Sequence, residues 1–154
     1  MSSLIRPINS REPAMNPLYE TQATAIGGRN GAAATSDGRL RFNLAIPKEL
    51  GGPSGEGVNP EQLFALGYAA CFLSAIKEVA GQSQIEIATD SNVTATVGIG
   101  PRETGEQLAL SVELMIDLPD LDRAIAQDLV LRAHDICPYS AAIRGNLDVR
   151  LRVA

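Results

Sequence analysis

The chain has 154 residues, of which 45% are hydrophobic and 20% charged, and it contains two cysteines and one histidine. A length and balance of this kind fit one globular domain with its own core. The formal net charge of −5, without any basic tract, argues against nucleic acid or an anionic membrane as the main partner. Two cysteines and one histidine cannot supply the four protein ligands of a structural zinc site, so no bound metal is expected.

The apolar runs and the first residues predict a cytoplasmic protein. No apolar run reaches the roughly 18 residues of a membrane span, and the start lacks the apolar region of a secretory signal. Cys71 and Cys137 lie 66 positions apart. In a reducing cytosol such a pair is more often catalytic or inert than a structural disulfide.

The first third of the chain predicts an arm followed by strands. Residues 1–16 are polar and aperiodic, which is typical of a loose arm, and residues 17–154 are expected to form a single domain. Tyr19–Ile26 is a candidate strand. Asp37-Gly38 is a hairpin signal, and residues 40–46 alternate between apolar and other side chains as in a half-buried strand.

A long helix is predicted after the glycine- and proline-rich loop at residues 47–60. Asn59 is a suitable N-cap, Pro60 suits the first helical position, and the helix should end near Val79 with Gly81 just beyond it. Its apolar residues lie nearly all the way round, which indicates burial on all sides. In a chain this short, such burial indicates that a second subunit covers part of the helix.

The remaining elements alternate between strands and helix. Residues 93–99 and 108–116 have the period of two of strands, and residues 147–153 form a last strand. Residues 121–136 have helical spacing; Asp120 is expected to cap this helix, and Pro138 to end it at Cys137. The order lacks a regular βαβ alternation, so the fold class is α+β with antiparallel sheet.

Cys71 lies in the apolar run of the long helix, where a free cysteine is by default a small buried hydrophobe. The residues around it, however, resemble the Ohr/OsmC family, most closely its organic hydroperoxide resistance (Ohr) branch. The resemblance rests on several separate motifs in the same order: GGRNG at Gly27–Gly31, ELGG at Glu49–Gly52, NPEQLFALGYAACF at Asn59–Phe72, CPYS at Cys137–Ser140 and RGNLDV at Arg144–Val149.

The resemblance implies an OsmC-like fold, an intertwined homodimer with antiparallel sheets around long central helices and two sites at the interface. It implies that Cys71 is the peroxidatic cysteine and Cys137 the resolving one, so that Cys71 becomes a sulfenic acid and then a Cys71–Cys137 disulfide. Arg29 would stabilise the Cys71 thiolate, and Glu61 would orient Arg29. The implied activity is reduction of organic hydroperoxides to alcohols without a bound cofactor, with dihydrolipoamide, often carried on a lipoylated protein, as the reductant.

The residue types fit this chemistry. A thiolate attacks peroxide oxygen, apolar burial raises the pKa of a cysteine, and a neighbouring guanidinium reverses that effect. Glu61 can hold the guanidinium of Arg29 through a bidentate pair. Glu61 and Cys71 are about 15 Å apart along a continuous helix and point about 80° apart around it. One arginine can therefore scarcely touch both unless the helix breaks early or the second subunit lends a residue. We favour the second explanation, because the resemblance implies sites at a subunit interface.

Simpler interpretations exist for each of these residues. Cys71 could be a packed core thiol, Arg29 a solvated side chain, and Glu61 a partner only of the helix dipole. His134, three residues before Cys137, is expected on the helix surface. Two rival functions also remain: a peroxidase of the OsmC branch with a different substrate range, and a noncatalytic lipid- or thiol-binding dimer of the same fold.

Overall fold

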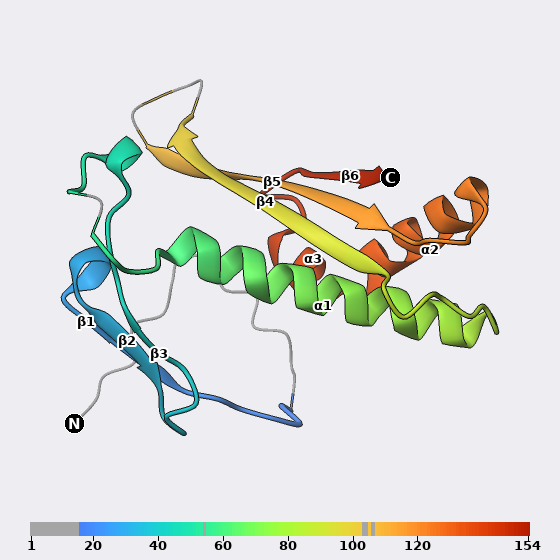
Figure 1. Ribbon diagram of the computed structural model, residues 1–154, viewed down its shortest axis with the longest axis horizontal. Coiled ribbons are helices and arrows are strands. Elements are labelled where there is room, and N and C mark those ends of the chain that lie inside the picture. Colours follow the sequence, from blue (N-terminus) through green and yellow to red (C-terminus); the bar gives the residue numbers. More distant parts are fainter. Residues whose placement is uncertain (1–15, 54, 103–104, 106) are drawn as a thin grey trace.

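The computed structural model describes residues 16–53, 55–102, 105 and 107–154. It contains two three-stranded sheets and a long helix, α1, which runs across the molecule in Figure 1. The elements follow in the order β1 (Ala23–Ile26), β2 (Ala32–Thr35), β3 (Arg41–Asn43), α1 (Pro60–Gln82), β4 (Asn92–Pro101), β5 (Leu108–Asp117), α2 (Arg123–Ile136), α3 (Pro138–Ile143) and β6 (Val149–Val153). The predicted α+β class is confirmed. Of the arm predicted at residues 1–16, all but Asn16 lies outside the described residues, and the domain boundary stays a prediction.

Helix α1 begins as the sequence predicts and ends later. The Asn59 side chain accepts a hydrogen bond from the Gln62 N–H while the Gln62 side chain accepts one from the Asn59 N–H, and Pro60 occupies the first turn. The helix continues through Gly81 to Gln82. Packing of its last turn on the core outweighs the low helix propensity of glycine, which is only about 1 kcal/mol.

One face of α1 forms the centre of the core. Tyr68, Phe72 and Ile76 follow one another at helical spacing and are fully buried. Burial of each such side chain stabilises the fold by roughly 1.5–3 kcal/mol. On another face Leu66 is 69% exposed, so the single chain does not bury α1 on all sides.

By length and composition α1 could cross a membrane, a test that the core helix of a soluble protein also passes. It is the one such helix in the part of the chain that the structure describes. The absence of a membrane span therefore stays a prediction.

The second sheet, of order β4-β5-β6, packs its apolar face on α1. Strands β4 and β5 are antiparallel over their whole length, and the alternation predicted for β5 is confirmed by the burial of Val112, Leu114 and Ile116. Strand β6, however, runs parallel to β5, so the prediction of purely antiparallel sheet is wrong for this pair. The physical reason is the long connection through α2 and α3, which returns the chain to the starting edge, as parallel pairing requires.

The first sheet, of order β1-β2-β3, lies near the N-terminal half of α1 (Figure 1). Both of its pairings are antiparallel, and the predicted hairpin turn is confirmed at Asp37 and Gly38. Every residue of β1 is exposed, including Ile26 at 75%, and Leu40 is 51% exposed. This sheet thus has apolar side chains that the single chain leaves uncovered.

Helix α2 ends before Cys137, as predicted from Pro138, but its cap differs from the prediction. The side chain of Asp122 accepts the Ala124 N–H at 2.8 Å, while Asp120 has a left-handed φ of 67°. Beyond the break the chain forms α3, with Pro138 in its first turn, which the sequence analysis did not predict. Cys137 is therefore the joint between two helices.

Candidate active site

Two free cysteines from distant parts of the sequence lie side by side in the structure. Cys71 is on α1 and half-buried, and Cys137, between α2 and α3, is fully buried. The Cys137 thiol donates a hydrogen bond to the Cys71 sulfur, with 3.6 Å between the two Sγ atoms. A disulfide needs about 2 Å, so a small movement would close the bond.

The surroundings of Cys71 favour its thiol form. Burial raises the pKa of Cys71, a hydrogen bond from the Tyr139 backbone N–H lowers it, and the neighbouring Cys137 raises it. The sum of these influences is a pKa above the ordinary value of a cysteine. A thiolate at this position would therefore need further stabilisation, by a neighbouring positive charge or by added hydrogen-bond donors.

Arg29 and Glu61 form the second cluster of predicted site residues. The Arg29 guanidinium donates to both carboxylate oxygens of Glu61, at 2.6 and 2.8 Å. This pairing lowers the pKa of Glu61, although burial works in the opposite direction, and it raises the pKa of Arg29. The predicted Arg29–Glu61 pair is thus present within one chain.

The glycine motif around Arg29 has a steric basis. Gly27 has a left-handed φ of 76°, and a Cβ on Gly31 would lie 1.7 Å from the Ile26 carbonyl oxygen. A side chain at either position would distort the turn. The turn therefore places Arg29 over the start of α1, where Glu61 lies in the first turn.

The two clusters do not meet within the described part of one chain. Both terminal nitrogens of Arg29 bond to Glu61, and the groups that shift the pKa of Cys71 are Tyr139 and Cys137. This agrees with the spacing argument that a single arginine cannot serve both Glu61 and Cys71 of its own helix.

The Glu61 pair gives an expected pH dependence of stability. Because the folded-state pKa of Glu61 lies below its ordinary value of 4.5, the stabilisation is complete above that pH and is lost as the pH falls through the lower folded pKa. Glu61→Gln should lower the free energy of unfolding by about 1 kcal/mol at pH 7, and the difference from wild type should shrink below about pH 4.5. Denaturant unfolding at several pH values, at one protein concentration, measures this.

Glu113→Gln is the matched control, since it removes a single ion-pair contact with Arg152 between β5 and β6 of the second sheet. Its cost at pH 7 should be below about 0.5 kcal/mol. A wild-type advantage over Glu61→Gln that persists undiminished at pH 3 would contradict the prediction.

A buried chain of hydrogen bonds behind the cysteines was not predicted from the sequence. The Tyr68 hydroxyl lies 2.8 Å from Ser140 Oγ, which lies 3.0 Å from His134 Nδ1. Burial raises the pKa of Tyr68 and lowers that of His134. His134 is therefore half-buried and hydrogen-bonded inward, and the prediction that it lies on the helix surface is wrong. Its position one helical turn before Cys137 was the only signal in the sequence.

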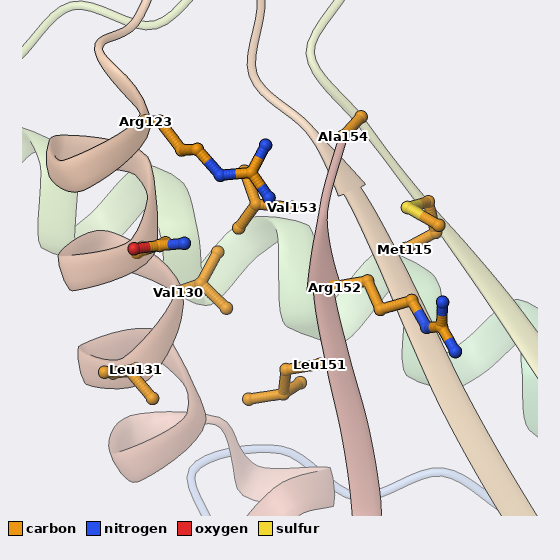
Figure 2. A pocket seen from close by; sticks show the side chains of 9 residues that line it. Met115, Arg123, Val130, Leu131, Leu151, Arg152, Val153 and Ala154 are labelled. Carbon is orange, nitrogen blue, oxygen red and sulfur yellow. The ribbon is translucent and has the colours of Figure 1, made fainter.

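An apolar cavity of about 510 Å³ is lined by the first sheet, α1 and Tyr139. Neither cysteine lines it, and its link to the cysteine pair is Tyr139, whose backbone N–H bonds to Cys71. The cavity of about 530 Å³ in Figure 2 lies instead between α2 and β6, and neither cysteine lines it. Among the described residues no group of three or more His, Cys, Asp or Glu could hold a metal ion.

Comparisons with known proteins identify the family. The sequence model of OsmC-like proteins matches residues 52–152. An organic hydroperoxide resistance protein of Xanthomonas axonopodis pv. citri is 50% identical over 137 residues, which is 89% of this chain and 95% of that protein. The chain belongs to the OsmC-like family. This membership confirms the resemblance inferred from the sequence motifs.

Solved structures of the family have the same fold. An organic hydroperoxide resistance protein from Legionella pneumophila has a TM-score of 0.83 and 47% identity, over 90% of this chain and 99% of that one. The protein OhrB of Bacillus subtilis has a TM-score of 0.82 and 43% identity, over 90% of this chain and 100% of that one. The OsmC-like fold predicted for this family member is therefore confirmed.

Proposed function

We propose that this protein is a cysteine-based peroxidase that reduces organic hydroperoxides to alcohols. The observation that carries the proposal is the pair of free thiols, Cys71 and Cys137, held 3.6 Å apart in a chain of the OsmC-like family. A relative with 50% sequence identity is named an organic hydroperoxide resistance protein, which supports the same substrate class.

The proposed reaction has two steps at the cysteine pair. The Cys71 thiolate attacks the terminal peroxide oxygen, which becomes bonded to sulfur as a sulfenic acid, and the alkoxide leaves and takes up a proton. The Cys137 thiol then displaces the hydroxyl group of the sulfenic acid as water, and a disulfide forms. The second step needs no change of fold, because the two Sγ atoms, 3.6 Å apart, only have to approach to the bonding distance of about 2 Å.

The Cys71 thiolate needs a cation, and we assign this role to Arg29 of a second subunit. Within one chain Arg29 is bound to Glu61 and burial raises the pKa of Cys71, and among the described residues no cation contributes to the pKa shift of Cys71. A homodimer in which the partner subunit's Arg29 faces Cys71 supplies the charge, and the guanidinium also stabilises the departing alkoxide. The exposed apolar side chain of Ile26, outside the lining of the apolar cavity, supports such an interface.

The apolar cavity beside Tyr139 supports a substrate with a carbon chain. Its wall consists mainly of alanine, leucine and aromatic side chains from the first sheet and α1, and few polar groups line it. A cavity of this kind favours alkyl or lipid hydroperoxides over hydrogen peroxide, because it binds hydrocarbon.

The proposed reductant is inferred from family membership alone. A lipoyl dithiol such as dihydrolipoamide, free or on a lipoylated protein, would reduce the Cys71–Cys137 disulfide by thiol–disulfide exchange and regenerate both thiols. A cytoplasmic location fits this chemistry, since the two thiols must be kept reduced between turnovers.

Steady-state turnover of cumene hydroperoxide tests the proposed function. The protein should turn over with dihydrolipoamide, slowly or not at all with the thioredoxin system, and faster on cumene hydroperoxide than on hydrogen peroxide. No turnover with either reductant would favour the noncatalytic binding dimer. A preference for hydrogen peroxide would favour a peroxidase of different substrate range.

A further inference from the structure

Three hydrogen-bonded side chains connect the same three helices that hold the cysteine pair. Tyr68 is on α1, His134 on α2 and Ser140 on α3, and the Ser140 hydroxyl joins the other two at 2.8 and 3.0 Å. Tyr68 and Ser140 are fully buried. Buried polar groups are costly unless they are paired, so this hydrogen-bonded chain exists in one well-defined arrangement.

We propose that Tyr68, Ser140 and His134 are positioning residues for the disulfide-forming step of the reaction. They fix the first turn of α3 against α1 and α2, and through that turn they hold Cys137 Sγ in front of Cys71 Sγ. The inference rests on the proposed function for its place in the cycle, while the positioning itself can be measured without peroxide.

The first turn of α3 depends on side-chain contacts for its position. The helix has six residues, too few to be stable in isolation, and the Cys137 side chain makes no capping hydrogen bond to it. Ser140 lies in this first turn, and the Ala141 N–H donates to the Cys137 carbonyl oxygen at 2.9 Å. A displacement of Ser140 is thereby transmitted to Cys137 through less than one helical turn.

One direction of the hydrogen bonds uses every hydroxyl proton of the chain. Burial lowers the pKa of His134 and favours its neutral form, and in the tautomer that carries the proton on Nε2, Nδ1 accepts from the Ser140 hydroxyl while Ser140 Oγ accepts from the hydroxyl of Tyr68. All three groups are satisfied in this arrangement. Loss of any one hydroxyl leaves a buried partner unpaired and loosens α3.

The position of Cys137 decides between two fates of the Cys71 sulfenic acid. If the Cys137 thiol attacks, a sulfur–sulfur bond forms, the sulfur–oxygen bond breaks, and water leaves with the thiol proton. Cys71 is thereby reduced and Cys137 oxidised. If the attack is delayed, a second hydroperoxide oxidises the sulfenic acid to sulfinic acid, which does not return to the cycle. A loosened α3 should therefore shift the product from disulfide to sulfinic acid.

The first measurement is the equilibrium between dithiol and disulfide in glutathione buffers, which gives the effective concentration of the two thiols. Ser140→Ala and Tyr68→Phe should each lower this effective concentration by about 5- to 30-fold, because a Cys137 thiol that is no longer held in front of Cys71 loses most of the advantage of proximity. His134→Leu should behave likewise. His134→Asn, which can place a hydrogen-bonding atom near the position of Nδ1, should recover much of the loss.

Ser83→Ala is the matched control. The Ser83 hydroxyl also connects α1 and α2, through a 2.9 Å hydrogen bond from Arg132, but it lies about 18 Å along α1 from Cys71. In Ser83→Ala the effective concentration of the two thiols should stay within about twofold of wild type. This should hold even if the melting temperature of this variant falls as far as that of Ser140→Ala.

The second measurement is the yield of sulfinic acid after one addition of cumene hydroperoxide, by mass spectrometry of the intact protein. Ser140→Ala and Tyr68→Phe should give severalfold more sulfinic acid than wild type and Ser83→Ala. Tyr68→Phe retains the buried ring, so it tests the hydroxyl even if Ser140→Ala does not fold. If the folded variants match wild type in both measurements, the inference is overturned. If the wild-type protein forms the disulfide in glutathione buffers but consumes no peroxide, the proposed function is overturned and the positioning role is not.

Discussion

Cys71→Ser is expected to lower the reduction of cumene hydroperoxide to the rate without enzyme. A serine hydroxyl is not ionised near neutral pH and cannot replace a thiolate as the attacking group. Peroxide consumption in single-turnover and steady-state assays measures the loss. The side chain is nearly isosteric, so the melting temperature should change little and loss of fold can be excluded.

Cys137→Ser should separate the two steps of the reaction. Cys71 remains able to attack, so this variant should consume one equivalent of hydroperoxide at close to the wild-type rate and then stop as a sulfenic acid. A dimedone adduct on Cys71, seen by mass spectrometry, would identify that product. Normal cycling of both variants with a lipoyl reductant would refute the assignment of the two cysteines.

Arg29→Ala is expected to lower kcat/KM for the hydroperoxide by about 100- to 1000-fold, the usual effect of removing one group that stabilises developing negative charge. It should also raise the pKa of Cys71, measured by thiol titration of the reduced protein. Arg29→Lys should remain well below wild type, because an ammonium group lacks the planar fork that binds both oxygens of Glu61.

Mixed dimers decide which subunit supplies Arg29. When a Cys71→Ser subunit is paired with an Arg29→Ala subunit, a site built across the interface has one intact copy, because the intact Cys71 meets the intact Arg29 of its partner. Such a dimer should have about half of the wild-type activity, since the two sites of a symmetric dimer are equivalent. A site built within one chain would leave both copies defective. An inactive mixed dimer would therefore contradict the proposed arrangement.

The parts of the fold governed by local patterns were predictable from the sequence. Asn59 and Pro60 mark the start of α1 because capping depends on a few adjacent residues, and the alternation of β5 identifies its buried face. The Arg29–Glu61 pair and the approach of the two cysteines were accessible only through the resemblance to a family. Both join residues that are far apart in sequence, and residue spacing alone does not place such residues together.

The features that were missed depend on tertiary structure. The parallel pairing of β6 depends on the path of α2 and α3 around the core, and strand periodicity is the same for both directions of pairing. Helix α3 is too short to have an apolar period. The inward position of His134 depends on Ser140, which α3 brings back towards α2.

The parallel β5–β6 connection has a consequence for the chemistry of Cys137. Both ends of the segment that contains this thiol continue into neighbouring strands of one sheet, so the segment is anchored at both ends. In the proposed reaction this anchoring would favour a disulfide within one chain, since Cys137 Sγ already lies 3.6 Å from Cys71 Sγ.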